Sequence, residues 1–166
     1  MGGTDLDLLE STVRQVAPCL AYLIPDHHDP TGTSLSDAGR ARVRVLAVRH
    51  RTVIIGDEAL GDLTLDGAPP TPFAGEGTDA GDVVWVSSGS RSFWRGQRIG
   101  WVRAHPDLVT RLSVTGAQVD LGTAVLGQLV TAHLLDRPDD VLPERRAMLR
   151  ERRDLLLALL AEELPG

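Results

Sequence analysis

Residues 82–104 read DVVWVSSGSRSFWRGQRIGWVRA, two apolar segments joined by a polar turn. Its two apolar ends, 82–88 and 98–104, have the composition of buried strands. The turn between them combines serine and glycine with an unusual density of arginine and tryptophan. Because a guanidinium group binds two anion oxygens at once, Arg91 and Arg98 are candidates to hold an anion in this turn.

Helices and strands alternate along the chain on both sides of this stretch. Two more apolar runs predict buried strands at 20–24 and 51–58, separated by loops rich in proline, glycine and aspartate. Capping residues and helical spacing of apolar side chains predict helices at 4–16, 37–50, 106–114, 118–135 and from Pro143 to the end. This alternation predicts an α/β fold, a three-layer sandwich with a mainly parallel sheet.

The spacing also predicts which side chains the helices bury. In the second helix the expected buried face carries Ala38, Ala41, Val45 and Val48. In the helix at 118–135, partial burial is expected for Val119, Val125, Leu126, Leu129 and Val130. In the last helix Leu149, Leu156 and Leu160 are expected to face inward, and solvent exposure is expected for Arg145, Arg146, Arg150, Arg152 and Arg153. Trp85 and Trp101 are expected in the core, and Trp94 at the loop tip within reach of an interface.

The composition limits the classes of function. A length of 166 residues suits a single domain over 1–166, in which 137–166 form a helical tail. A net charge of −6 argues against direct contact with nucleic acid, and no apolar run is long enough for a membrane span. The first residues lack a signal-peptide pattern, so we expect a cytoplasmic location. All 17 basic residues are arginine, and a chain without lysine cannot form a lysine Schiff base.

Four motifs, in order, resemble fold-type I aminotransferases that depend on pyridoxal phosphate (PLP). They are AYLIPDHHDPTG at 21–32, VIIGDEALGDL at 53–63, SSGSRSFWRGQRIGW at 87–101 and the arginine-rich tail that begins at 133. The chain is similar in particular to the aminotransferase-like domain of MocR-type regulators of the GntR family. The resemblance covers nearly the whole chain and implies a truncated PLP-transferase-like large domain.

The resemblance implies cofactor-binding roles for several side chains. Asp57 matches the carboxylate that pairs with the pyridinium nitrogen of PLP, which keeps the ring an electron sink. Ser88, Ser90 and Arg98 match the groups that hold the cofactor phosphate. These positions keep the family's residue types.

Three central positions depart from the family pattern. Asp29 stands where the family has the asparagine that bonds the 3-hydroxyl of PLP, and Leu60 replaces the tyrosine that serves the same oxygen. Arg91 stands in place of the Schiff-base lysine, and a guanidinium stays protonated and cannot form that bond. The combination predicts lost catalysis, with no catalytic residue and, at most, non-covalent binding of PLP or another small anion.

The resemblance also predicts partners. By family standards the winged-helix DNA-binding domain, the early strands of the large domain and the small domain are missing, so we expect a homodimer or a partner chain that supplies them. The alternative function is one subunit of a split aminotransferase whose lysine comes from the partner chain. A third hypothesis, a transcription regulator proper, would need a partner protein to contact DNA.

Simpler roles remain open for the same residues. Asp57 can cap a neighbouring loop, and Arg91 can neutralise Asp57 or Asp29 instead of binding a ligand. His27 and His28 are adjacent and point apart in an extended loop, so no metal site is expected.

Overall fold

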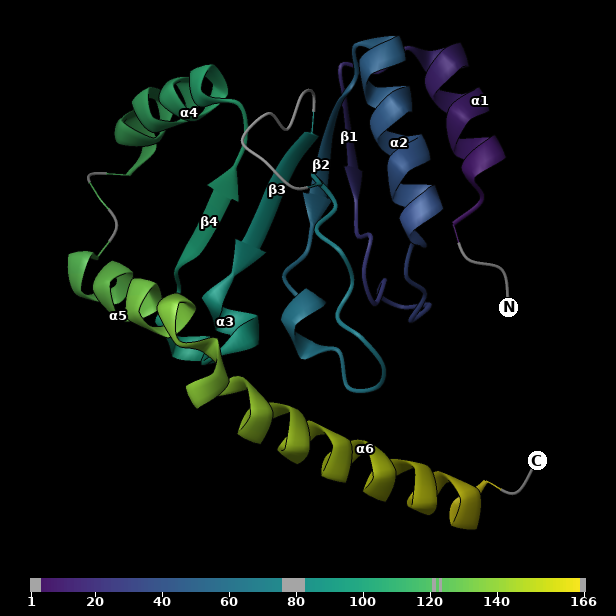
Figure 1. The fold of residues 1–166 in the computed structure, drawn as a ribbon, viewed down its shortest axis with the longest axis vertical. Coiled ribbons are helices and arrows are strands. Elements are labelled where there is room, and N and C mark those ends of the chain that lie inside the picture. Colours follow the sequence, from purple (N-terminus) through teal and green to yellow (C-terminus); the bar gives the residue numbers. More distant parts are fainter. Residues whose placement is uncertain (1–3, 76–82, 121, 123, 165–166) are drawn as a thin grey trace.

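The structure, a computed structural model, describes residues 4–75, 83–120, 122 and 124–164. One sheet holds four strands in sequence order (Figure 1): β1 (Leu20–Leu23), β2 (Val53–Asp57), β3 (Val83–Ser88) and β4 (Gly100–Arg103). The first three strands run parallel, and β4 runs antiparallel to β3. The predicted α/β class and mainly parallel sheet are therefore confirmed. Asp82, expected in the third strand, and 76–80, expected in a loop, lie outside the described residues.

The helices follow the predicted order with shifted ends. They are α1 (Leu6–Val16), α2 (Asp37–His50), α3 (Gly89–Ser92), α4 (Pro106–Val119), α5 (Val125–Asp136) and α6 (Leu142–Glu163). Short 3-10 turns lie at Gly61–Leu63, Arg95–Gln97 and Pro138–Asp140. The helix predicted at 118–135 is wrong at its start, because α4 continues through Val119 and α5 begins only at Val125. The sequence also missed α3, a single helical turn directly after β3.

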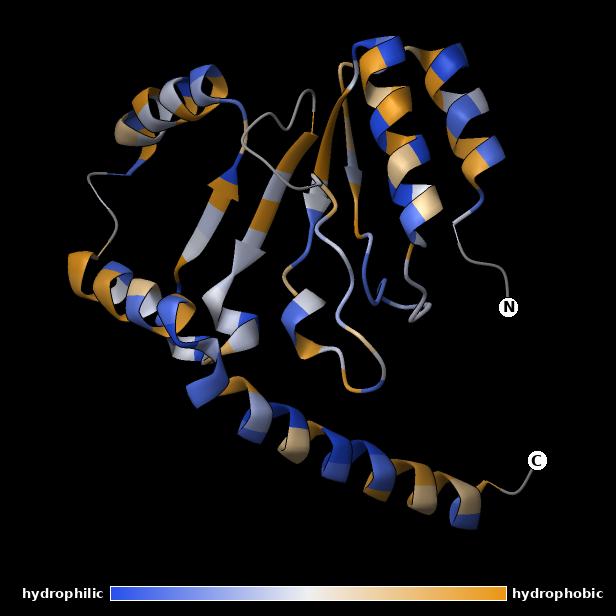
Figure 2. Cartoon of the chain, in the orientation of Figure 1, coloured by the Kyte–Doolittle hydropathy of each residue, from blue (hydrophilic) through white to orange (hydrophobic). Residues whose placement is uncertain are grey.

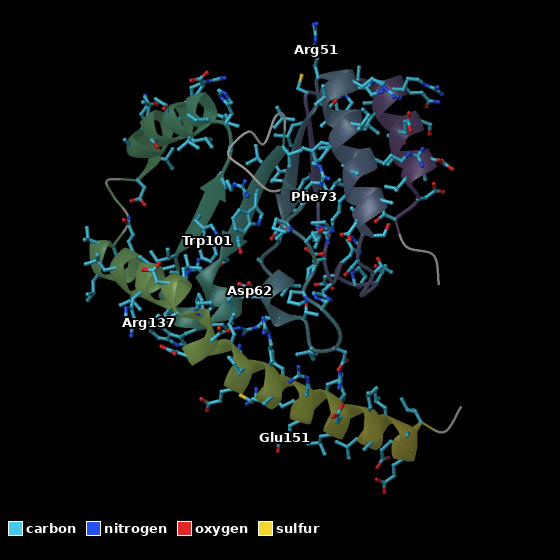
Figure 3. The ribbon with its side chains drawn as sticks, in the orientation of Figure 1. Arg51, Asp62, Phe73, Trp101, Arg137 and Glu151 are labelled. Carbon is cyan, nitrogen blue, oxygen red and sulfur yellow. The ribbon has the colours of Figure 1, made fainter. Side chains whose placement is uncertain are left out.

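Helices α1 and α2 cover one face of the sheet (Figure 1). At the surface, Arg42 of α2 links the two helices, because it pairs with Asp7 and Glu10 of α1 at 2.6 and 2.8 Å. The hydrogen bond from Arg42 to Glu10 lowers the pKa of Glu10. Beneath this link lies the core, made of Val13, Val43, Leu46, Ala47, Ile54, Phe73, Ala74 and Val83. Phe73 is labelled in Figure 3. Its ring occupies space that only a glycine leaves open, because a Cβ at Gly56 would lie 2.4 Å from the Phe73 Cδ1 atom.

The buried face of α2 differs from the prediction. Val45 and Val48 are 55% and 63% exposed, while Arg40, Val43 and Ala47 face the sheet and are almost fully buried. Small apolar residues occur on several sides of this helix, so their spacing did not single out one face. The helix turns Arg40 inward because two acidic side chains lie beneath it to neutralise its charge.

Helices α4 and α5 carry exposed apolar residues, as the orange positions in Figure 2 show. The burial predicted for this region is wrong, because large fractions of Val119, Val125, Leu126, Leu129 and Val130 are exposed. Periodicity predicts an apolar face, but it does not say whether any part of the chain covers that face.

Helix α6 is attached to the segment after β2 by its arginines. The Arg146 Nε donates to the Asp62 carbonyl at 2.8 Å, and the Arg150 Nε donates to the Leu65 carbonyl at 2.6 Å. Arg153 pairs with Asp66. The prediction that Arg146, Arg150 and Arg153 are only solvated is therefore wrong. The prediction that Leu156 and Leu160 face inward is also wrong, because both are exposed. Arg152 is exposed, as expected.

None of the helices in the described part of the chain is long and apolar enough to cross a membrane.

Candidate functional site

The predicted site residues gather at the edge of the sheet where β2 and β3 end. These strands are parallel, and Asp57, the last residue of β2, lies opposite Val86. Ser88 follows Val86 by two positions and therefore points to the same face of the sheet as Asp57. Asp57 and the serine–arginine loop thus share one edge and one face.

Asp57 already has a hydrogen-bond donor on each oxygen. The Tyr22 hydroxyl donates to Oδ2, and the Ala59 backbone N–H donates to Oδ1 at 2.9 Å. The hydrogen bond to Asp57, together with partial burial and the negative charge, raises the pKa of Tyr22 to about 12. Asp57 is therefore held in place by the chain itself, which also matches the simpler capping role considered from the sequence.

Hydrogen bonds between its own backbone N–H groups and two serine side chains shape the loop from Ser88 to Arg98. The Ser88 Oγ accepts from the Ser90 N–H at 3.3 Å, and the Ser90 Oγ accepts from the Arg98 N–H at 3.2 Å. Arg98 itself has a left-handed backbone, with φ of 53°. A Cβ at Gly89 would lie 2.7 Å from the Gln97 Oε1 atom, so a larger residue there would displace the end of the Gln97 side chain.

This loop encloses a cationic cavity. Ser88, Ser90, Arg91, Arg95 and Arg98 line a space of about 310 Å³. The three arginines are exposed, and none of them forms an ion pair with a carboxylate in the part of the chain that the structure describes. Positive charge and small hydroxyl groups around one cavity favour an anion with several oxygens.

Two details of this cavity were not foreseen. Arg95 was not among the predicted site residues, although its position between Arg91 and Arg98 in the same loop was a usable signal. Arg91 does not neutralise Asp57 or Asp29 within the described residues, so that alternative is not what the structure contains.

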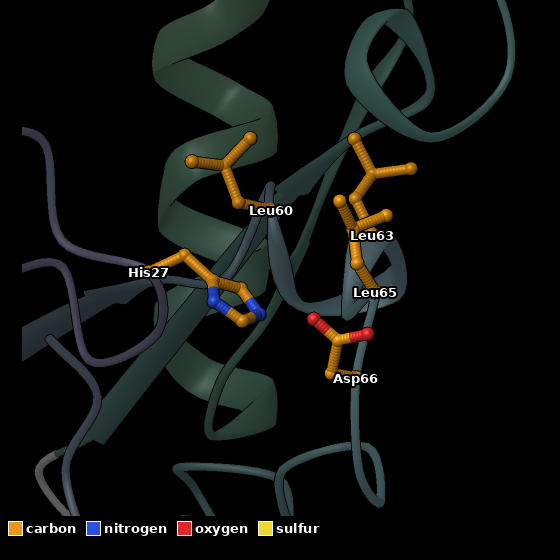
Figure 4. Close-up of a pocket in the computed structure, with 5 residues that line it drawn as sticks. All are labelled: His27, Leu60, Leu63, Leu65 and Asp66. Atoms are coloured by element: carbon orange, nitrogen blue, oxygen red, sulfur yellow. The ribbon is translucent and has the colours of Figure 1, made fainter. Parts of the chain in front are cut away.

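Asp29 and Leu60 do not join the loop cavity. Asp29 is exposed in the loop after β1. Leu60 lines a separate, larger cavity of about 380 Å³ with His27, Leu63, Leu65 and Asp66 (Figure 4). That cavity is mainly apolar and contains none of the groups expected to bind an anion.

The two histidines make local hydrogen bonds. The His27 Nε2 atom lies 2.9 Å from the Thr64 hydroxyl, and the His28 Nδ1 atom lies 2.9 Å from the Thr31 hydroxyl. Among the described residues, no group of three or more metal-ligating side chains is close enough to hold a metal ion.

The sequence also missed a buried ionic cluster. Arg40 pairs with Asp26 and lies 3.5 Å from a Glu58 oxygen, which also accepts from the Phe73 N–H at 2.9 Å. Arg40 is 1% exposed and Asp26 is fully buried. Burial is the main cause that raises the pKa of Glu58 to about 7. Helical spacing places Arg40 on the same face as Val43 and Ala47, but the sequence did not show that this face is the buried one.

Comparison with known proteins gives matches along the whole chain. The family model for aminotransferase class I and II matches residues 3–166. An uncharacterized aminotransferase of Saccharolobus solfataricus is 30% identical over 99% of this chain and 42% of its own length. The uncharacterized HTH-type transcriptional regulator YisV of Bacillus subtilis is 31% identical over 95% of this chain and 33% of its own length.

The fold matches a solved aminotransferase as well. The α-aminoadipate aminotransferase LysN of Thermus thermophilus, complexed with N-(5'-phosphopyridoxyl)-L-leucine, superposes with a TM-score of 0.87 at 28% identity. The match covers 98% of this chain and 43% of that one. The chain therefore spans less than half the length of each of these proteins.

Proposed function

The chain belongs to the aminotransferase class I and II family, and we propose that it is a non-catalytic member that binds PLP or another small anion without a covalent bond. The observation that carries this proposal is the cavity formed by Ser88, Ser90, Arg91, Arg95 and Arg98. It keeps the means to bind a phosphate, and it has an arginine in place of the lysine that the family pattern requires.

The residues of this chain fit one part of PLP. Three guanidinium groups and two serines around one cavity suit a phosphate, whose oxygens accept several charge-assisted hydrogen bonds. A helix of one turn, α3, begins beside this cavity, and the Ser88 side chain caps it. Phosphate binding is therefore the part of the family's site that this chain retains.

The residues do not fit the rest of the cofactor. Leu60 lies in another cavity and has no donor for the 3-hydroxyl, Asp29 is exposed outside the loop cavity, and Arg91 offers no reactive amine. In the family, PLP supplies an electron sink once a lysine holds it covalently. This chain has no lysine beside the cavity to form that bond, so the proposed function is binding and includes no reaction.

Equilibrium dialysis tests this proposal. We expect PLP to bind the purified chain with one site, to leave completely on dialysis and to be displaced by inorganic phosphate. We expect no transaminase activity when the chain is supplied with amino acids and 2-oxo acids. Retention of PLP after exhaustive dialysis, or turnover of an amino acid, would overturn the proposal.

Self-association accompanies the proposed function. Several large apolar side chains are exposed, including Trp94 at the tip of the loop and Leu126 and Leu129 on α5. Such residues gather at interfaces between proteins more often than on a free surface. We expect a homodimer, which sedimentation velocity at two protein concentrations would detect, and a chain that stays monomeric would rule it out.

A second candidate is one subunit of a split aminotransferase. The exposed apolar residues of α4 and α5 are suited to contact with a partner chain, which would bring the lysine. Transaminase activity that appears only when both chains are mixed would support this candidate.

A role in transcription, suggested by the HTH-type relative, would likewise require a partner that contacts DNA. The cytoplasmic location stays a prediction.

A further inference from the structure

The arginine cavity carries more positive charge than a single phosphate group balances. Its lining consists of Ser88, Ser90, Arg91, Arg95 and Arg98, with no acidic side chain among the described residues. The three arginines are exposed, and none of them has a carboxylate partner in the described part of the chain. A phosphate monoester carries a charge of about −2 near neutral pH. One guanidinium charge is therefore left for a further anionic group.

The resemblance to the aminotransferases explains only part of this lining. Ser88, Ser90 and Arg98 match the groups that hold the one phosphate of PLP. Arg91 stands in place of the Schiff-base lysine, and Arg95 matches none of the family's cofactor-binding positions. This chain therefore adds two guanidinium groups to a site that the family uses for one phosphate.

The two additional arginines lie on turns that the fold holds in place. Arg91 is in α3, whose last residue donates a side-chain hydrogen bond to Asp62 at 2.7 Å. Figure 1 shows α3 directly at the end of β3. Arg95 begins the 3-10 turn that ends at Gln97, and the buried Gln97 side chain donates to the Thr131 hydroxyl of α5 at 2.7 Å. Each additional guanidinium is thus carried by an anchored backbone while its own side chain stays exposed.

The cavity is also larger than one phosphate group requires. A water molecule takes up about 30 Å³ and a phosphate group is only a few times larger, whereas the cavity has a volume of about 310 Å³. Space and charge therefore both exceed what one phosphoryl group uses.

We propose that this cavity binds a diphosphate group. Ser88, Ser90 and Arg98 hold one phosphoryl group, and Arg91 and Arg95 hold the other. A guanidinium group suits both positions, because its N–H donors match a pair of phosphoryl oxygens. This inference rests on the proposed anion binding at the same cavity and adds the class of ligand.

Calorimetric titration of the chain with inorganic pyrophosphate and with inorganic phosphate tests the proposal, at one ionic strength and without divalent cations. We expect one pyrophosphate per chain and an affinity at least about tenfold higher than that for phosphate, because two further guanidinium groups engage the ligand. Methylenediphosphonate, which has two linked phosphoryl groups and no bridging oxygen, should bind about as tightly as pyrophosphate. Phosphate should compete with pyrophosphate for the same site.

Two variants separate the two halves of the cavity. Arg95→Gln should reduce the preference for pyrophosphate over phosphate at least about threefold, because Arg95 holds only the second phosphoryl group. Arg98→Gln should weaken both anions by a similar factor and keep the preference. Arg111→Gln, on α4, is the control and should change neither affinity. The three substituted side chains are exposed, so these changes leave the core intact.

Diphosphate groups occur both as the inorganic ion and in nucleoside diphosphates, and titration with ADP distinguishes these sources. ADP that binds as tightly as pyrophosphate would support a diphosphate ester as the ligand. ADP that binds no more tightly than phosphate, beside tight pyrophosphate, would support the inorganic ion.

The outcomes separate this inference from the proposed function. If neither phosphate nor pyrophosphate binds, the anion site fails and the diphosphate assignment fails with it. If phosphate binds but pyrophosphate binds no more tightly, anion binding stands and the diphosphate assignment is overturned. An unchanged preference in Arg95→Gln would overturn it as well, because the second phosphoryl group would then lie elsewhere.

Discussion

The hydroxyl of Tyr22 on β1 donates a hydrogen bond to the carboxylate of Asp57 on β2. Asp57 is the position that the family pattern assigns to the ring nitrogen of PLP, and its other oxygen accepts from the Ala59 N–H. Tyr22 is the only tyrosine in the chain, so this contact can be observed directly in solution.

Titration of tyrosinate absorbance tests the contact between Tyr22 and Asp57. We expect a midpoint at about pH 12 in the folded chain, and a midpoint nearer the ordinary value of about 10 in Asp57→Asn. Since the folded pKa is raised, the contribution of Tyr22 to stability is present below about pH 10 and is lost as the pH rises toward 12. A native midpoint at the ordinary value, unchanged by Asp57→Asn, would contradict the hydrogen bond.

Removal of one guanidinium should weaken anion binding. Arg98→Ala is expected to lower the affinity for inorganic phosphate roughly five- to tenfold, because an exposed charged hydrogen bond contributes about 1 kcal/mol. Isothermal titration at low ionic strength measures it, and Arg111→Ala, on exposed α4, is the matched control. If both variants bind phosphate equally well, the loop cavity is not the anion site.

The close approach of Phe73 to Gly56 should make that glycine irreplaceable. Gly56→Ala is expected to destabilise the fold by about 1–3 kcal/mol, since the new methyl group would overlap the ring. Gly116→Ala is the control, because a Cβ there meets nothing within 4 Å inside α4, and it should stabilise by about 0.5–1 kcal/mol. Chemical denaturation measures both, and a neutral Gly56→Ala would show that Phe73 packs elsewhere.

The attachment of α6 should depend on individual arginines. Arg150→Ala removes the hydrogen bond to the Leu65 carbonyl and is expected to speed amide exchange along α6 by roughly fivefold. Arg152→Ala, on an exposed position of the same helix, should leave exchange unchanged. Hydrogen–deuterium exchange measured by mass spectrometry separates the two variants, and equal rates would argue against this attachment.

The sequence predicted the parts of the fold that depend on local pattern. Apolar runs located all four strands, and the helix predicted at 37–50 is α2, where the Ser36 side chain accepts from the Gly39 N–H. Helix faces were less predictable, because burial depends on what lies opposite. Arg40 is inside since Asp26 and Glu58 neutralise it, while Val45 and Val48 remain outside.

The candidate site also combines residues that the sequence predicted with residues that it could not predict. The serine–arginine loop could be predicted because its residues are contiguous, and Asp57 because it ends a parallel strand beside that loop. The partner of Asp57 could not, since Tyr22 is 35 residues away and meets it only through the register of β1 and β2. The buried ionic cluster was missed for the same reason, because Asp26 follows β1, Arg40 lies in α2 and Glu58 follows β2.

The central claim is that Arg91 has ended covalent chemistry at a site that still binds the anion. Its most direct test is borohydride reduction of the chain mixed with PLP, followed by peptide mapping by mass spectrometry, on the natural protein and on Arg91→Lys. We predict no reduced cofactor on the peptide that carries residue 91 in the natural chain and one reduced cofactor at that residue in Arg91→Lys, because only the variant has a lysine at the cavity; the N-terminal amine, which can react in both chains, lies in another peptide. A reduced cofactor on the loop peptide of the natural chain, or none at residue 91 of Arg91→Lys, would contradict the account.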